Sequence, residues 1–207
     1  MPIRAVYCST LRGVSRRITI IQGHPDGSAE HLCHALAEAY RLGAEAAGHE
    51  VRSIAVAALT FPLITSREDF EHGERPESIR EAQSVIRTSD HLVIVYPLWL
   101  GTMPALLKAF VEQVFRYDFA FQPEPGGRYR AHLTGRSARV VVTMGMPVLA
   151  YRWWFGAHSL KSLERNILKF AGIRPVRESL FGRVEQVDEA TRRRWLAEMR
   201  RLGGKGR

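Results

Sequence analysis

The sequence predicts an α/β fold: a doubly wound, five-stranded parallel sheet with helices on both faces. Three observations lead to this fold class. Short, continuously apolar segments alternate along the chain with longer segments of helical periodicity. Continuous apolar character is typical of strands that are buried on both faces. No repeat, linker or low-complexity tract divides the 207 residues, and this length suits a single domain.

Strands and helices alternate in the expected order of elements. The strands are expected at residues 18–21, 51–56, 92–95, 140–143 and 174–181. The helices are expected at residues 29–47, 77–88, 104–115, 159–170 and 188–201. Most of the strands are continuous apolar runs, whereas the second alternates between apolar and polar residues.

Apolar residues at helical spacing define the helices. In residues 29–47 they recur every three or four positions, and Gly48 ends the helix. Residues 77–88 form a polar helix with one apolar face. Pro104 suits the first turn of the helix at 104–115, because proline lacks the N–H group that is unpaired there anyway.

Five strand units in a chain of this length predict a flavodoxin-like or similar doubly wound sheet, with strand order 2-1-3-4-5. Residues 17–207 are expected to form one domain, preceded by a flexible extension at 1–16. In such sheets a ligand binds beyond the carboxyl ends of the strands, where the strand order reverses. This rule selects the three loops that follow Ile21, Val95 and Thr143.

The net charge of +9 indicates either an anionic partner or a solvated basic helix face. We favour the solvated face and expect no nucleic-acid partner, because no nucleic-acid-binding motif accompanies the charge. Cys8 and Cys33 are expected to be free thiols, and without metal-ligand spacing no metal site is expected. No apolar run approaches the length of a membrane span, and the N-terminus lacks a signal-peptide pattern, so we expect a cytoplasmic protein.

The first loop, IQGHPDGSAEHL, begins at Ile21 and leads into a helix. Gly23 and Gly27 permit tight turns, and Ser28 is expected to cap the helix that begins near Ala29. A helix N-terminus offers free N–H groups and a favourable dipole to an anion. An ordinary capped turn and a phosphate-binding loop are both compatible with these residues.

The second loop, PLWLGTMP, has almost no polar side chains. Pro97 ends the strand and Gly101 bends the chain. Leu98, Trp99 and Leu100 then remain at the mouth of the strand, where a flat aromatic ligand could lie with its polar edge against the main chain. The alternative is that Trp99 packs on the core, as a single tryptophan usually does. The composition of the loop favours the ligand.

The third loop, TMGMPVLAYRWWFGAH, surrounds an aromatic cluster. The Thr143 hydroxyl and the Gly145 main chain could bind the edge of a ligand. Tyr151 and His158 are candidate proton donors, because phenol and imidazole both suit general acid catalysis. The alternative is that the aromatic cluster belongs to the core or to a dimer surface.

Together these segments resemble the NAD(P)H:quinone oxidoreductases, flavodoxin-like flavoproteins that include ancillary subunits of bacterial glutathione-gated potassium efflux systems. The resemblance extends over about residues 18–183. It is carried by four motifs, GHP, YPLWLGTMPALLKAFVEQVF, FAFQPEPGGRYRAHLTGR and TMG followed by Tyr151.

The resemblance implies a flavin that is held by the three loops. FMN is favoured over FAD, because the chain is short for a member that holds a whole FAD. The phosphate and ribose match the first loop, the isoalloxazine ring matches the second, and the far edge of the ring matches the third. The expected cofactor contacts are His24, Ser28, Pro97, Leu98, Trp99, Leu100, Thr143 and Gly145.

The resemblance also implies an activity, in which NAD(P)H reduces the flavin and a quinone-type acceptor reoxidises it. Tyr151 and His158 match the Tyr and His that stabilise developing charge beside the ring. The family is homodimeric, and each active site is completed by the neighbouring subunit. The same family offers an alternative, a flavin-binding regulatory subunit that docks on a potassium efflux antiporter at the membrane.

Overall fold

The computed structural model describes residues 15–28 and 30–207. The expected flexible extension at 1–16 therefore lies outside the described residues except for Ser15 and Arg16, and Cys8 lies outside them as well. Cys33 is a buried free thiol.

Five strands form one parallel sheet, in the order β2-β1-β3-β6-β7, which confirms the predicted order of the five main strands. The two central strands, β3 and β6, are buried along their whole length. The strands are β1 (Arg17–Gln22), β2 (Glu50–Ala55), β3 (His91–Pro97), β6 (Ser137–Met144) and β7 (Val176–Gly182).

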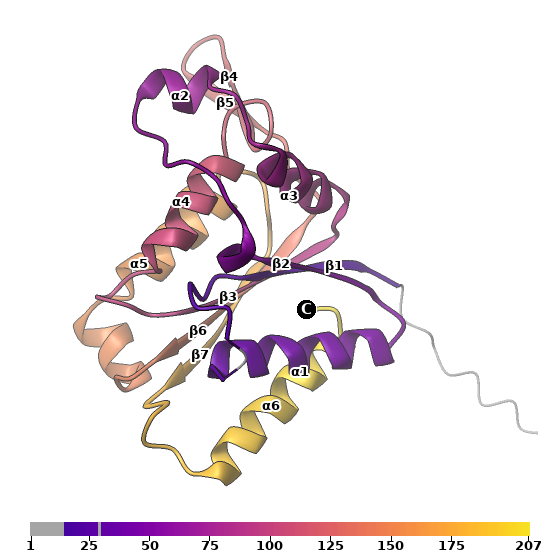
Figure 1. The fold of residues 1–207 in the computed structure, drawn as a ribbon, viewed down its shortest axis with the longest axis vertical. Coiled ribbons are helices and arrows are strands. Elements are labelled where there is room, and N and C mark those ends of the chain that lie inside the picture. Colours follow the sequence, from indigo (N-terminus) through magenta and orange to yellow (C-terminus); the bar gives the residue numbers. More distant parts are fainter. Residues whose placement is uncertain (1–14, 29) are drawn as a thin grey trace, which may run out of the picture.

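Helices cover both faces of the sheet (Figure 1). Helices α1 and α6 pack on one face, and α3, α4 and the α5–η3 segment pack on the other. The helices are α1 (Leu32–Ala46), α2 (Arg67–His72), α3 (Glu77–Thr88), α4 (Ala105–Val114), α5 (His158–Lys161) and α6 (Glu189–Gly204). The short helical turns are η1 (Val56–Ala58), η2 (Ala150–Trp154) and η3 (Ser162–Leu168). Each helix of the described part is too short or too polar to cross a bilayer.

Helices α1 and α6 touch main chain to main chain through two glycines. A Cβ atom added at Gly43 would overlap the carbonyl group of Arg200, and one added at Gly203 would overlap the carbonyl group of Tyr40. This close contact fixes α1 on the sheet, and so fixes the position of its N-terminus at the end of β1.

Several element boundaries differ from the prediction. Helix α1 begins at Leu32 rather than near residue 29, and its N-cap is His31. Ser28 therefore does not cap the helix, because its N–H and hydroxyl groups bond the carboxylate of Asp26 instead. Pro104 is the N-cap of α4 rather than a residue of its first turn.

An antiparallel hairpin, β4 (Phe121–Glu124) and β5 (Arg128–Ala131), lies outside the main sheet and was not predicted. Its strands lack an apolar run, which is the pattern that identified the other strands. Gly126 and Gly127 form the turn, and both have positive φ angles that glycine adopts readily. The hairpin is thus encoded by its turn rather than by its strands.

Candidate functional site

The three loops chosen from the sequence meet at one edge of the sheet. The N–H of Gly23 donates to the carbonyl of Val95 at 2.8 Å, and the N–H of Leu98 donates to the carbonyl of Thr143 at 2.7 Å. A hollow of about 310 Å³, which we call the first hollow, lies over these loops. Its lining residues are His24, His31, Leu32, Cys33, Pro97, Leu98, Trp99, Thr143, Met144, Gly145, Val184 and Glu185.

Six of the predicted contact residues line this hollow, namely His24, Pro97, Leu98, Trp99, Thr143 and Gly145. Ser28, Leu100, Tyr151 and His158 do not. The sequence analysis did not select Cys33 and Glu185, whereas His31 lies within residues 29–32, the alternatives to Ser28 as the phosphate contact. Cys33 was assigned to the interior of a longer helix, and Glu185 follows the last strand, whose end was not among the three loops.

A tight turn follows β3. The N–H of Trp99 donates to the carbonyl of Thr102 and the reverse bond also forms, both at 2.9 Å. The two residues between them, Leu100 and Gly101, have φ angles of 47° and 79°, which are typical of a type I′ turn. A positive φ is strained for leucine, and the Leu100 side chain is completely exposed at the tip of the turn.

This turn leaves fewer main-chain N–H groups of the second loop free for a ligand than expected. The main chain of residues 98–100 was expected to bond the edge of a ligand, but the N–H groups of Leu98 and Trp99 already donate within the protein. Leu100 supplies the remaining N–H of this segment. Trp99 is 48% exposed and lines the hollow, which keeps a volume of about 310 Å³, so its side chain does not fill it.

Gly145 leaves its main chain open to a ligand. Apart from the chain neighbours, a Cβ atom added at this residue meets no atom within 4 Å, so the space beside its main chain is open. Beside it, the Thr143 hydroxyl lies 3.1 Å from the Cys33 thiol. Burial raises the pKa of Cys33 to about 11, so this thiol stays protonated and is not a nucleophile at neutral pH.

The first loop and the start of α1 gather three imidazole rings. His24 stacks on His31 with ring centroids 3.9 Å apart, and His34 lies 5.6 Å from His24. Burial, and secondly the neighbouring His31, lower the pKa of His24, so its ring is neutral at pH 7. Its Nδ1 lies 3.1 Å from both the N–H nitrogen and the carbonyl oxygen of Asp26, so Nδ1 is engaged within the loop and Nε2 is the ring nitrogen left for a ligand.

This end of the hollow suits an anion. Helix α1 has no side-chain cap and no acidic residue in its first turn. Its first N–H groups and the positive end of its dipole are therefore available to a ligand. Within residues 15–28 and 30–207, no three His, Cys, Asp or Glu side chains converge in an arrangement that could hold a metal ion.

The two predicted proton donors occupy different environments. The Tyr151 side chain is 1% exposed, its hydroxyl accepts the N–H of Leu160 at 3.3 Å, and burial raises its pKa. His158 is exposed at the start of α5. The next residue, Ser159, lies with its hydroxyl 3.0 Å from that of Thr102, which places His158 near the Trp99 turn.

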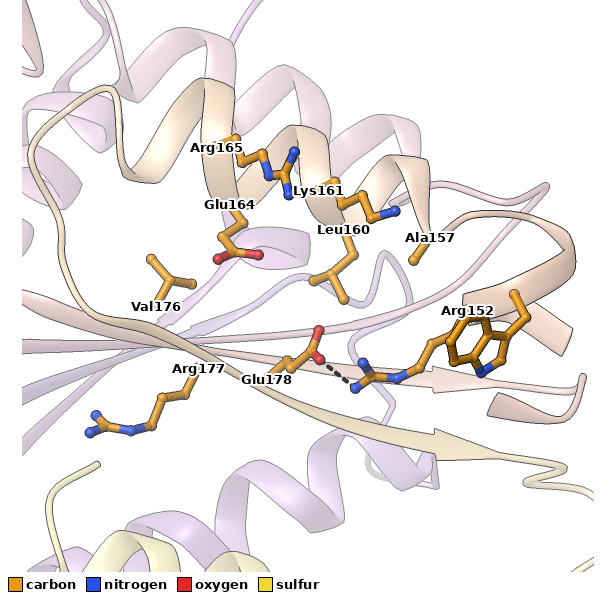
Figure 2. A pocket seen from close by; sticks show the side chains of 10 residues that line it. Arg152, Ala157, Leu160, Lys161, Glu164, Arg165, Val176, Arg177 and Glu178 are labelled. Carbon is orange, nitrogen blue, oxygen red and sulfur yellow. Dashed lines mark hydrogen bonds and ion pairs between the residues drawn. The ribbon is translucent and has the colours of Figure 1, made fainter. Parts of the chain in front are cut away.

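Two further hollows lie on either side of the α5–η3 segment. One, of about 420 Å³, adjoins the first hollow, because Trp99 lines both, and it also contacts Leu100, Lys108 and Ser159. The other, of about 380 Å³, lies between this segment and the edge strand β7 (Figure 2). An ion pair between Arg152 and Glu178 crosses it, and none of the predicted site residues lines it.

The residues of the first hollow fit a flat heteroaromatic group that carries a phosphate. The N-terminus of α1 and the imidazole donors suit the phosphate, whereas Pro97, Leu98 and the open main chain of Gly145 suit the ring. A flavin mononucleotide has this combination of groups.

Comparisons with known proteins agree with this geometry. A curated protein of Haemophilus influenzae, described as an uncharacterised NAD(P)H oxidoreductase, is 28% identical over 139 residues, which are 65% of this chain and 68% of the relative. The glutathione-regulated potassium-efflux ancillary protein KefG of Salmonella paratyphi B is 38% identical over 71 residues, 34% of this chain. That match spans only 36% of KefG.

Solved structures share the fold. The NAD(P)H:quinone oxidoreductase of Methanothermobacter marburgensis superposes with a TM-score of 0.78 at 24% identity, covering 92% of this chain and 96% of that one. An FMN-dependent NADH-azoreductase of Bacillus anthracis, solved with FMN, gives 0.72 at 16% identity, covering 91% and 97%. A family model described as the flavodoxin-like fold matches residues 16–202. The chain therefore belongs to the flavodoxin-like fold family.

Proposed function

We propose that this protein is an FMN-dependent NAD(P)H oxidoreductase that reduces quinones or similar aromatic acceptors. The observation that carries the proposal is the juxtaposition, in one hollow, of an anion-binding helix end and an open apolar floor. The names of the H. influenzae relative and of the two structural neighbours support the same reaction class. When bound, the flavin supplies the hydride chemistry.

The residues of the chain would bind and orient the cofactor. His24 Nε2 and the first N–H groups of α1 would hold the phosphate. Pro97 and Leu98 would form the floor beneath the ring, and the main chain of Gly145 would meet its polar edge. Trp99 separates this hollow from its neighbour of about 420 Å³, which would receive NAD(P)H and the acceptor in turn.

Steady-state kinetics test the proposal. Protein reconstituted with FMN is expected to oxidise NADPH or NADH in the presence of a quinone, with parallel double-reciprocal lines, because both substrates use one face of the cofactor in turn. Control reactions that contain free FMN but no protein measure the background rate of NAD(P)H oxidation. Converging lines would contradict alternate use of one site, and a rate no higher than with free FMN would contradict the proposal itself.

His158 is the better placed of the two proposed proton donors, because it is exposed and precedes Ser159, which bonds Thr102 of the Trp99 turn, whereas Tyr151 is buried. His158→Gln is expected to slow reoxidation of the reduced flavin by quinone about tenfold or more in stopped-flow traces. Tyr151→Phe is expected to have a smaller effect on this step and little effect on flavin binding. An unchanged rate in His158→Gln would remove His158 from the mechanism.

We also propose a homodimer. The η2 segment exposes adjacent large apolar side chains, with Trp153 84% and Trp154 85% exposed, and such a patch is costly to leave in water. Light scattering after gel filtration is expected to give twice the chain mass for the native protein and the chain mass for a Trp153→Glu/Trp154→Glu variant. A native protein of single chain mass would contradict the dimer.

A second candidate function is a regulatory subunit of a potassium efflux antiporter, and the similarity to KefG is the observation that favours it. The two functions differ in whether the protein must bind a membrane transporter to act. Co-purification with an antiporter from detergent-solubilised membranes would favour the subunit, whereas quinone reduction by the isolated protein at an enzyme's turnover would favour the oxidoreductase.

A further inference from the structure

The carboxylate of Asp26 accepts three hydrogen bonds in the loop that leads into α1. It accepts the N–H of Ser28 at 2.9 Å and the Ser28 hydroxyl at 3.1 Å. The Nε2–H of His31 donates to it at 2.8 Å. His31 is the N-cap of α1 and lines the first hollow, whereas Ser28 precedes the helix and does not line the hollow. A phosphate bound at this end of the hollow would therefore compete with Asp26 for the His31 donor.

Asp26 has no packing role that would hold it there. Its side chain is 56% exposed, so moving the carboxylate away from Ser28 and His31 would expose little surface that is now buried. The bonds from His31 and from the Ser28 N–H lower the pKa of Asp26 to about 2, so it is an anion at every physiological pH. Asp26 is thus an anion that polar contacts hold beside the N-terminus of α1.

The other charged and titratable groups around these donors come from several elements. His24 stacks on the His31 ring, and His34 donates its Nε2–H to the carbonyl of Asp26 at 3.0 Å. Glu185, after β7, lines the same hollow, and Glu30 is exposed beside His31. Among Asp26, Glu30 and Glu185, it is Asp26 whose carboxylate accepts hydrogen bonds from Ser28 and His31.

We infer that Asp26 is an internal competitor of the cofactor, and that the flavin phosphate displaces its carboxylate from His31. The inference rests on the proposed function, because it concerns the same site. His31 is then a phosphate ligand in the loaded protein and a partner of Asp26 in the free protein. Asp26 therefore sets how tightly the phosphate-bearing flavin is held, without touching the ring.

Asp26→Asn tests the exchange, because asparagine keeps an oxygen for the Ser28 N–H but lacks the negative charge. Binding of FMN and of riboflavin, which lacks the phosphate, is followed by quenching of flavin fluorescence at fixed salt. The variant is expected to bind FMN roughly tenfold more tightly, the size of one charge-assisted hydrogen bond. Riboflavin affinity is expected to stay unchanged.

Two further variants separate competition from general charge. Glu30→Gln removes a nearby charge that occupies none of the donors, and it is expected to change FMN affinity less than Asp26→Asn. His31→Gln is expected to weaken FMN and not riboflavin, and to abolish most of the gain from Asp26→Asn in the double variant. Equal gains in Glu30→Gln and Asp26→Asn would overturn the inference.

The outcomes also distinguish this inference from the proposed function. If native protein binds FMN and Asp26→Asn binds it equally or more weakly, Asp26 is no competitor, and the proposed function stands. If native protein binds neither FMN nor riboflavin, the proposed function fails and the inference fails with it.

Discussion

Gly203→Ala is expected to lower the free energy of unfolding by about 3 kcal/mol or more, the upper range for forced overpacking. The added methyl group would overlap the main-chain carbonyl of Tyr40 on α1, and a main-chain atom cannot rotate away as a side chain can. Chemical denaturation followed by circular dichroism measures the change, and the midpoint is expected at a much lower denaturant concentration.

Gly204→Ala is the matched control, one residue further along α6. A Cβ atom at this residue would lie 3.4 Å from the Gly43 carbonyl oxygen, which is close to ordinary contact. Alanine also has a higher helix propensity than glycine, so this variant is expected to be neutral or more stable by up to about 1 kcal/mol. Equal stability of the two variants would show that α1 and α6 do not touch as described.

The α1–α6 contact matters for the site as well as for stability. Helix α1 carries His31 and Cys33 to the edge of the first hollow. A shift of this helix on the sheet would move the anion-binding end away from the floor at Pro97 and Leu98. Weakened flavin binding is therefore expected in Gly203→Ala even where the protein remains folded.

Gly145→Val is expected to separate folding from cofactor binding. Apart from residue 145 itself and its chain neighbours, no protein atom lies within 4 Å of the position of an added Cβ, so the side chain has room in the free protein and the denaturation midpoint is expected to stay unchanged. The same side chain would project into the space that we assign to the flavin ring. FMN affinity is expected to fall by at least about tenfold, the cost of overpacking by 1–3 kcal/mol.

Gly145→Ala provides a graded control, with a smaller side chain at the same residue. Its FMN affinity is expected to lie between those of the native protein and Gly145→Val, measured by the same fluorescence titration. Normal FMN binding by Gly145→Val would place the ring elsewhere. A large loss of stability in that variant would mean that the main chain at Gly145 is not open.

The strand order and the place of the ligand hollow could be predicted from the sequence, because buried strands of a parallel sheet are apolar throughout and the site follows from the order. Trp99 and Gly145, which line the hollow, were selected in this way, and His24 was selected from the family resemblance. The start of α1 could not be predicted in the same way. The N–H and hydroxyl of Ser28 donate to the carboxylate of Asp26 and form a turn before the helix, and the spacing of apolar residues carries no information on such local hydrogen bonds.

Other details depend on tertiary contacts that no sequence pattern expresses. Tyr151 and Trp153 belong to one aromatic run, yet the first is 1% exposed and the second 84%. Only the path of the chain through η2 decides which ring enters the core. The occupied N–H groups of Leu98 and Trp99 likewise depend on the turn to Thr102 and on pairing with β6.

The central claim is that the hollow at the carboxyl ends of β1, β3 and β6 holds a flavin. The most direct measurement is the visible absorption spectrum of the purified protein after incubation with FMN and removal of free cofactor. A flavin spectrum in stoichiometric amount, bleached anaerobically by NADPH or NADH, is the predicted result. Protein that stays colourless after incubation with FMN and with FAD would contradict the claim.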